Sequence, residues 1–277
     1  MRKIRSLINI FGILIFYYLT AIGLTKCGMD PLTVTAIVDI MIATLLVSWW
    51  TLHKECRIMP CQLQNGFGTL LFMFLLMFIA GQLTGTMIES IFGLGSFKQY
   101  QTTMHANAAI ALLLSLIIAP IGEECLVRGF IYQQLRRDWG FWVAWFGQAG
   151  LFALMHGTLV HAVPTFLTAL FLGLLYERTG DLRWPIGFHM VYNLLVVFAS
   201  GVSVPKVLYA PWIDIPLDIV CVLVMTVMFA KVLDDKCVNT YEAKPIGTAH
   251  LATRSIEKRK EESYETQEKN NQSRTFS

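Results

Sequence analysis

Long apolar stretches separated by short polar ones run along most of the chain. They cover roughly residues 6–26, 32–52, 67–92, 106–135, 141–160, 163–177, 185–201 and 209–231. Most are close to the ~20 residues that an α-helix needs to cross the hydrocarbon core of a bilayer. Because they are apolar all round, they are typical of helices that face lipid or other helices. The pattern predicts an all-α polytopic membrane protein with about eight transmembrane helices.

The end of the chain departs from this pattern. Residues 232–277 carry eight basic and eight acidic residues, and the stretch 256–277 is rich in Gln, Asn and Ser. Such a segment has too little apolar surface to bury for stable folding. We expect residues 234–277 to form a disordered cytosolic tail, with partner binding as the alternative.

Basic residues are distributed unevenly between the expected loops. With a cytosolic N-terminus, the outside loops hold Lys26, Lys98 and Lys206. The inside loops hold Arg2, Lys3, Arg5, Lys54, Arg57, Arg136, Arg137, Arg178 and Arg183. Cytoplasmic loops carry an excess of Lys and Arg, so this distribution predicts that both termini are cytosolic. The net charge of +3 gives no reason to expect a nucleic-acid partner.

The cysteines indicate neither a disulfide framework nor a zinc site. The six cysteines include no CxxC pair. His53, Cys56 and Cys61 lie close together, but their spacing matches no established zinc pattern. We therefore expect no metal there.

Three charged residues interrupt the fourth apolar stretch. Glu123, Glu124 and Arg128 directly follow the uncharged run 106–119. A charge at membrane depth is costly and usually functional. On a helix, Glu124 and Arg128 lie one turn apart in the order that favours an ion pair. Glu123 points about 100° away from Glu124. We expect Arg128 to neutralise Glu124 and leave Glu123 free for chemistry.

Two further polar pairs lie in later stretches. Phe152 and His156 are one helical turn apart, and so are His189 and Asn193. Each alone has an ordinary explanation as an interhelical hydrogen-bonding group. Together with a glutamate, they could activate water without a metal. A glutamate beside a histidine can hold a water and take its proton, and a histidine and an asparagine can donate to a developing oxyanion.

The three signatures Glu-Glu-x-x-x-Arg, Phe-x-x-x-His and His-x-x-x-Asn occur in this order in the chain. This arrangement resembles the CPBP intramembrane proteases, which include the glutamate-type CaaX prenyl endopeptidases and bacterial immunity-related relatives. The resemblance covers about residues 105–200. We accordingly divide the chain into N-terminal transmembrane helices (1–104), a CPBP-like catalytic core (105–201), a last transmembrane helix (202–233) and the tail (234–277).

The resemblance implies a role for each matching residue. Glu123 would be the general base and His156 would share the activation of water. His189 and Asn193 would form the oxyanion site. Glu124 and Arg128 would orient the site, and Phe152 would pack it. The family resembles a metal-independent peptidase, so no cofactor is implied. The expected partners are a peptide or protein substrate at the membrane, such as a prenylated CaaX tail or a leader peptide, and the lipid bilayer itself.

Alternative interpretations remain open. Glu123, His156 and His189 could ligate zinc, although the chain has no HExxH motif and Arg128 would repel a cation. A non-catalytic membrane protein, acting in bacteriocin self-immunity or binding a membrane sensor, could use the same residues structurally. Intramembrane Glu and His also occur in proton-coupled transporters. The hypothesis is an intramembrane endopeptidase, placed in a bacterial plasma membrane by analogy with bacterial relatives, with a eukaryotic prenyl-protein protease of the endoplasmic reticulum as the alternative.

Hydropathy places the two histidines at different depths. His189 lies about five residues past the expected cytosolic turn at 179–181, or roughly 8 Å, and His156 lies roughly 24 Å past its own turn. We expect either a deep start for the seventh helix or helices tilted around a wet cavity. Asp39, in mid-span, is expected to be a hydrogen-bonded structural residue, and Asp214 and Asp218 are expected to meet solvent.

Overall fold

A computed structural model of the chain describes residues 2–52, 67–92, 112–201 and 211–234, all within one compact unit, Met1–Tyr241. The predictions for His53, Cys56 and Cys61 and for a disordered tail beyond residue 234 lie outside the described residues.

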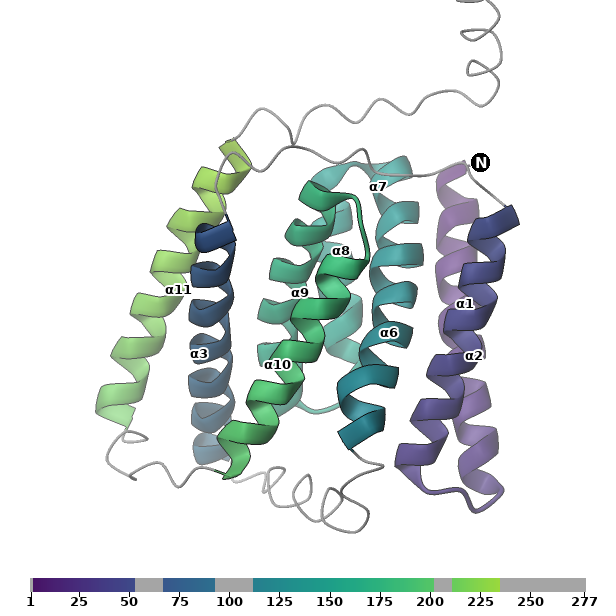
Figure 1. Cartoon of the computed structure of the whole chain (residues 1–277), viewed down its shortest axis with the longest axis horizontal. Coiled ribbons are helices and arrows are strands. Elements are labelled where there is room, and N and C mark those ends of the chain that lie inside the picture. The colour runs from purple at the N-terminus through teal and green to yellow at the C-terminus, as the bar shows by residue number, and fades with distance from the viewer. Residues whose placement is uncertain (1, 53–66, 93–111, 202–210, 235–277) are drawn as a thin grey trace, which may run out of the picture. The chain divides into compact units, whose positions relative to one another are not determined.

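The described part of the chain is entirely helical apart from short connections, and it contains no strand. Counting the unbroken run from 112 to 139 as one helix, it has eight helices (Figure 1). They are α1 (Arg2–Lys26), α2 (Pro31–Leu52), α3 (Phe67–Phe92), the run η1 (Leu114–Ile118), α6 (Ala119–Glu124), η2 (Cys125–Tyr132) and α7 (Gln133–Trp139), then α8 (Phe141–Met155), α9 (Leu159–Thr179), α10 (Arg183–Gly201) and α11 (Pro211–Asp234). The predicted all-α fold is confirmed.

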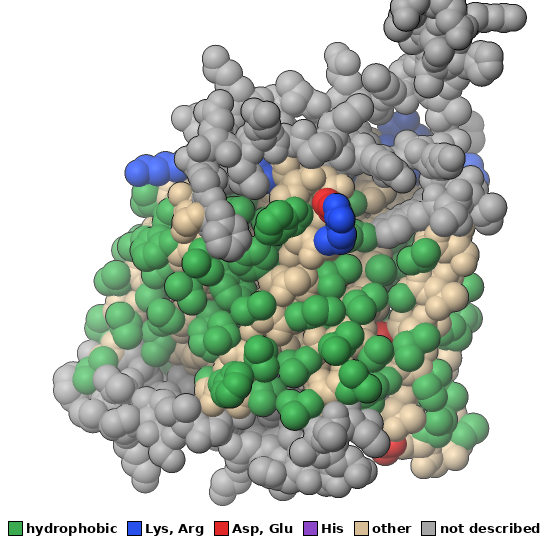
Figure 2. All heavy atoms as spheres, in the orientation of Figure 1, with side chains coloured by type: hydrophobic (Ala, Val, Ile, Leu, Met, Phe, Trp, Pro, Cys, Tyr) green, Lys and Arg blue, Asp and Glu red, His purple; other side chains and the backbone are tan. Residues whose placement is uncertain are grey.

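Apolar side chains cover much of the surface of these helices. Three helices are long and apolar enough to cross a membrane, at Arg2–Lys26, Gly68–Gly85 and Val160–Thr179. Figure 2 shows a broad apolar face, on which the visible Lys and Arg side chains lie near the upper edge. A soluble monomer rarely exposes an apolar patch of this extent. The helices therefore suit a lipid environment, as expected for an integral membrane protein.

The fifth and sixth helices differ from the expected stretches 141–160 and 163–177. α8 ends at Met155 and α9 begins at Leu159. Between them Gly157 has a φ of 73°, a left-handed conformation that glycine adopts without steric cost. The next residue, Thr158, is extended. The break lies inside an uncharged sequence, so hydropathy alone did not reveal it.

Glycines permit two close helix contacts near the centre of the bundle. A Cβ atom added to Gly122 of α6 would lie 2.4 Å from Cβ and 2.9 Å from Cα of Asp39 on α2. A Cβ added to Gly173 of α9 would lie 2.5 Å from Nε2 of Gln148 on α8. Both distances are too short for a real side chain. The contact of Gly122 with the Cβ and backbone of Asp39 therefore requires glycine, whereas at Gly173 the end of the Gln148 side chain would have to move. The two contacts bring α2 against α6 and α8 against α9.

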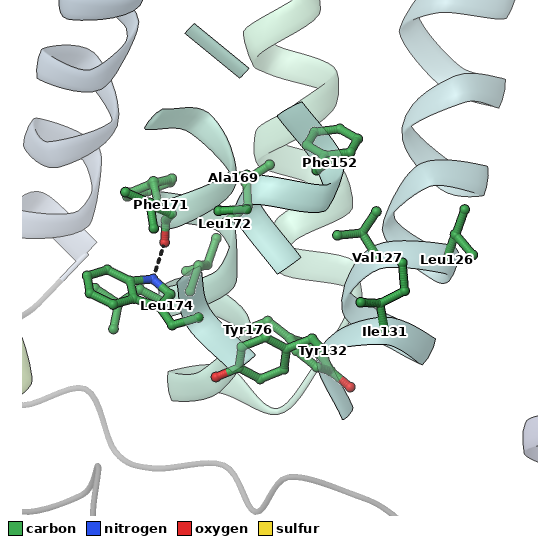
Figure 3. Packing of buried hydrophobic residues seen from close by; sticks show 14 of the residues in the cluster. Leu126, Val127, Ile131, Tyr132, Phe152, Ala169, Phe171, Leu172, Leu174 and Tyr176 are labelled. Carbon is green, nitrogen blue, oxygen red and sulfur yellow. Dashed lines mark hydrogen bonds between the residues drawn. The ribbon is translucent and has the colours of Figure 1, made fainter. Parts of the chain in front are cut away.

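The buried core joins the run 112–139 to α8 and α9. Leu126, Val127 and Ile131 of η2 belong to the same apolar cluster as Phe152 of α8 and Phe171 of α9 (Figure 3). The dashed line in Figure 3 marks a 2.7 Å hydrogen bond from Nε1 of Trp145 to the carbonyl oxygen of Leu170, which ties α8 to α9. Both η1 and η2 are π-helical. Short π-helical segments are frequent at functional sites, and these two flank α6, where Glu123 and Glu124 lie.

Candidate active site

Glu124 and Arg128 form the ion pair that their spacing predicts. Nη1 of Arg128 donates to Oε1 of Glu124 at 2.7 Å, and both side chains are completely buried. Nη2 of Arg128 also donates to the carbonyl oxygen of Ala169 on α9 at 3.0 Å. Its guanidinium carbon lies 5.1 Å from the ring centroid of Phe152, within cation–π range. Arg128 thus joins its own helix to α8 and α9 while it neutralises Glu124.

His189 of α10 lies between the two glutamates. Its Nδ1 is 2.9 Å from Oε1 of Glu124, and its Nε2 is 3.6 Å from Oε2 of Glu123. A carboxylate only accepts hydrogen bonds, so we assign the hydrogen to Nδ1 of His189. Nε2 is then directed toward Glu123. The Glu123 side chain is 17% exposed, whereas that of Glu124 is fully buried. Glu123 is therefore the glutamate that water can reach.

The ring of Phe152 packs against both His156 and His189. Its ring centroid lies 4.8 Å from that of His156 and 6.0 Å from that of His189. The histidines that hydropathy placed at different depths therefore both contact one phenylalanine. α10 runs at a slant to its neighbours (Figure 1), which agrees with the expectation of tilted helices.

His156 lies at the C-terminal end of α8, with its ring half-buried. Nδ1 is 2.9 Å from the carbonyl oxygen of Phe152. Because a carbonyl oxygen only accepts, Nδ1 carries the hydrogen, and Nε2 of the neutral ring presents a lone pair. His156 is thus held in the tautomer that can accept a proton or a hydrogen bond at Nε2.

Asn193 contacts η1, near the start of the helical run 112–139 that also carries the two glutamates. Its Nδ2 donates at 2.8 Å to the carbonyl oxygen of Ser115 in η1. This bond joins α10 to η1, one turn from His189. The carboxamide nitrogen is bonded to backbone rather than to any other candidate site residue.

One buried carboxyl beside the site was not among the candidates from the sequence. Asp39 of α2 is 1% exposed and packs directly against Gly122, the residue before Glu123. Oη of Tyr17 donates to Oδ1 of Asp39 at 3.2 Å. From its place in mid-span, Asp39 was expected to be a hydrogen-bonded structural residue. The available signal was a charged residue in mid-span of an otherwise uncharged helix.

The structure corrects the expectation that the side chain of Asp218 meets solvent. Oγ1 of Thr84 on α3 donates to Oδ2 of Asp218 at 2.8 Å. The other oxygen is buried and has no hydrogen-bond partner. The surrounding helix packing, α11 against α3, was not visible in the sequence. The side chain of Asp214 lies outside the described residues.

The arrangement offers a reachable carboxylate, two imidazoles and a fixed ion pair in one part of the bundle. Over the described ranges, no group of three or more His, Cys, Asp or Glu side chains is placed to hold a metal ion. A carboxylate that water can reach, beside an imidazole held by a second carboxylate, is suited to general base chemistry.

The match to known proteins falls on the segment that carries this site. Residues 105–195 match the family described as type II CAAX prenyl endopeptidase Rce1-like. This confirms the resemblance to the CaaX-protease group that the motifs indicate. The chain is also similar to YdiL of Bacillus subtilis (strain 168), a protein named as a candidate membrane peptidase, with 28% identity over 127 residues. That alignment covers 45% of this chain and 52% of YdiL, so the chain spans about half the length of this curated relative. No solved structure matches the chain.

Proposed function

We propose that this chain, whose residues 105–195 resemble the type II CAAX prenyl endopeptidases, is an intramembrane endopeptidase that uses Glu123 as its general base. The observation that carries the proposal is the difference in burial and hydrogen bonding between the two adjacent glutamates. Glu124 is fully buried and bonded to Arg128 and His189, whereas Glu123 is 17% exposed and beside Nε2 of the same histidine.

In the proposed reaction, Glu123 and His156 hold a water molecule next to the peptide carbonyl. Glu123 takes a proton from the water as its oxygen forms a bond to the carbonyl carbon. The protonated Glu123 then gives this proton to the leaving nitrogen as the C–N bond breaks, releasing a carboxylic acid and an amine. General acid–base catalysis of this kind contributes about 10²–10⁴-fold to the rate.

His189 and Asn193 are the proposed donors to the oxyanion. With Nδ1–H of His189 directed at Glu124, Nε2 can donate only when the ring is protonated. Asn193 has two N–H bonds on Nδ2, so one remains for the oxyanion while the other binds the carbonyl oxygen of Ser115. Glu124 and Arg128 orient His189, and Phe152 keeps the two imidazoles apart.

The proposed substrate is a membrane-associated peptide, either a prenylated CaaX tail or a leader peptide. The proposed location is a bacterial plasma membrane with both termini in the cytosol. The distribution of Lys and Arg between the loops supports this orientation.

The test is cleavage of internally quenched peptides by the purified, detergent-solubilised chain with EDTA present. The panel contains a prenylated CaaX peptide and several leader peptides. We expect the wild type to cleave at least one peptide and Glu123→Gln to lower kcat by about 10²–10⁴-fold. The melting temperatures of the two proteins should agree.

Asp218→Asn is the matched control, because Asp218 is another partly buried carboxyl on a helix but has no contact with the glutamates. It should cleave like the wild type. Loss of wild-type activity in EDTA would favour the zinc alternative. Full activity of Glu123→Gln would overturn the assignment of the base. Cleavage of no peptide by a folded wild type would contradict the protease proposal and favour a binding protein.

A further inference from the structure

In the described part of the chain, the carboxyl of Asp39 is hydrogen-bonded at one oxygen and not at the other, unlike a fully satisfied structural residue. It lies on α2, outside the segment 105–195 that matches the endopeptidases. Oδ1 accepts the hydrogen bond from Tyr17, whereas Oδ2 is buried and has no hydrogen-bond partner among the residues that the structure describes. Buried polar atoms are almost always satisfied by protein or by ordered water. An oxygen at this position therefore needs a donor.

Asp39 is adjacent to the proposed base. Its Cβ and Cα are in contact distance of Gly122, and Glu123 is the next residue. Its carboxyl is close enough to that of Glu123 for the two to interact electrostatically, and so is the hydroxyl of Tyr17. Tyr17, Asp39 and Glu123 thus lie together on α1, α2 and α6, on the far side of Glu123 from the matched helices α8 and α9.

Glu123 has no hydrogen bond to a side chain within the described part of the matched segment, residues 112–195. Its contact with Nε2 of His189 is 3.6 Å, which is too long for a hydrogen bond. Glu124, by comparison, is fixed by two bonds of 2.7 and 2.9 Å. A catalytic base is normally oriented by a third group, and residues 112–195 supply such a group to His189 but not to Glu123.

We propose that Asp39, itself held by Tyr17, is the positioning residue for Glu123 and acts through one ordered water. This water donates one hydrogen to Oδ2 of Asp39 and the other to the carboxylate of Glu123. It is distinct from the nucleophilic water, which lies between Glu123 and His156. A polar site with two acceptors can hold such a water. The inference rests on the proposed function, because it assigns Asp39 a role in that reaction.

The test compares kcat, KM and melting temperature for Asp39→Leu, Asp39→Asn, Tyr17→Phe and the pair Tyr17→Phe/Asp39→Leu, using the peptide that the wild type cleaves. We expect Asp39→Leu to lower kcat by about 100-fold with KM unchanged, the effect of a misplaced catalytic group. Asp39→Asn keeps an oxygen for the water and should recover most of the loss. The double variant should be no slower than Asp39→Leu, since Tyr17 acts through Asp39.

The melting temperature separates a positioning role from a structural one. Replacing both partners of a buried hydrogen bond by apolar groups of similar shape can be nearly neutral. The pair Tyr17→Phe/Asp39→Leu should therefore melt close to the wild-type temperature while its kcat falls. Asp218→Leu is the matched control, because Thr84 bonds one of its oxygens and the other is unpaired, as in Asp39. It should leave kcat unchanged.

The outcomes distinguish a failure of the inference about Asp39 from a failure of the proposed function. Wild-type kcat in Asp39→Leu, or a fall in kcat that follows a fall in melting temperature, would overturn the inference and leave the proposed function standing. If Asp39→Leu does not fold, a wild-type kcat in Tyr17→Phe would overturn the inference, because Tyr17 holds Asp39 in place. If the wild type cleaves no peptide, the proposed function fails first, and the inference falls with it.

Discussion

Two buried glutamates that contact the same stripe of one helical run, Glu124 within the run and Glu177 on α9, show how differently this protein uses one residue type. Glu177 of α9 is bonded at both oxygens. Oε1 accepts from Nη2 and Nε of Arg136 at 2.8 and 3.0 Å. Oε2 accepts from the hydroxyl of Tyr132 at 2.7 Å.

Glu124 is satisfied at only one oxygen. Oε1 accepts from Arg128 and His189, while Oε2 is buried without a partner, and so is Nε of Arg128. Glu124, Arg128, Tyr132 and Arg136 follow one another at intervals of four residues along the same run. One stripe of a single helix therefore carries both clusters.

The difference separates an anchor from a site. A buried ion pair in which every atom is satisfied holds helices in place, as the Glu177 cluster holds η2 and α7 to α9. Unsatisfied buried atoms are costly, and real proteins keep them mainly where function requires them. Among the described residues, unpaired atoms occur on Glu124, Arg128 and Asp39, and Glu124 and Asp39 lie beside Glu123, which water can reach. Substitutions in the two clusters should therefore differ in their effects on stability and on kcat.

Removing Arg128 should break the site cluster altogether. Arg128→Leu leaves the carboxylate of Glu124 fully buried without its ion-pair partner. Loss of one partner of a buried pair costs about 3–5 kcal/mol. We expect a large fall in the melting temperature of the detergent-solubilised protein and a low yield. A melting temperature equal to that of the wild type would contradict a stabilising role for the Glu124–Arg128 ion pair.

A methyl group at Gly122 should disturb both packing and chemistry. In Gly122→Ala the new Cβ would overlap Asp39, and overpacking of this kind costs about 1–3 kcal/mol. Because Glu123 is the next residue, kcat should fall as well. The matched control is Gly150→Ala in α8, where nothing lies within 4 Å of the added Cβ and helix propensity predicts equal or greater stability. Equal melting temperatures for both variants would contradict the close contact between α2 and α6.

Glu177→Gln should weaken the anchor and spare the chemistry. The carboxamide keeps one acceptor for Arg136 and loses the charge, so we expect a loss of stability of about 1–3 kcal/mol. The kcat per folded molecule, corrected by an active-fraction measurement, should stay at the wild-type value. A lower kcat at unchanged stability would place Glu177 in the site and remove the distinction between the two clusters.

A third cluster should give a smaller, pH-dependent effect. Asp138, beyond the expected span end at residue 135, is bonded to Ser6 and Arg137 and lies 2.7 Å from Nε of Arg2. Burial acts to raise the pKa of Asp138, but the hydrogen bonds from Arg137 and Ser6 and the charges of Arg137 and Arg2 outweigh it and lower the pKa.

The lowered pKa of Asp138 decides how its contribution to stability changes with pH. Asp138 adds stability above the ordinary aspartate pKa of about 3.9, and this contribution is lost as the pH falls through the lower folded-state pKa. The melting temperature of the wild type, followed from neutral pH to below pH 4, should therefore fall more steeply than that of Asp138→Asn. Parallel curves would contradict the interaction of Asp138 with α1.

Several features of the fold and site could be predicted from local sequence. Helices follow from apolar stretches of spanning length, and the Glu124–Arg128 pair follows from its i, i+4 spacing, because both depend on residues within one or two turns. The motifs also placed Glu123, Phe152, His156 and His189 in the segment that matches the endopeptidases. The end of α8 was missed, because a turn at Gly157 can interrupt a helix without any charge nearby.

What the sequence alone determined is therefore the helical membrane class and the residue types available for chemistry, since hydropathy and helical spacing are local properties. Only the tertiary structure decided which of these residues meet. The contact of Asp39 with Gly122, the bond from Asn193 to Ser115, and the complete pairing of Glu177 join residues 41 to 83 positions apart. Such contacts depend on where helices cross and how closely their backbones approach, and no short-range pattern in one helix specifies its neighbour.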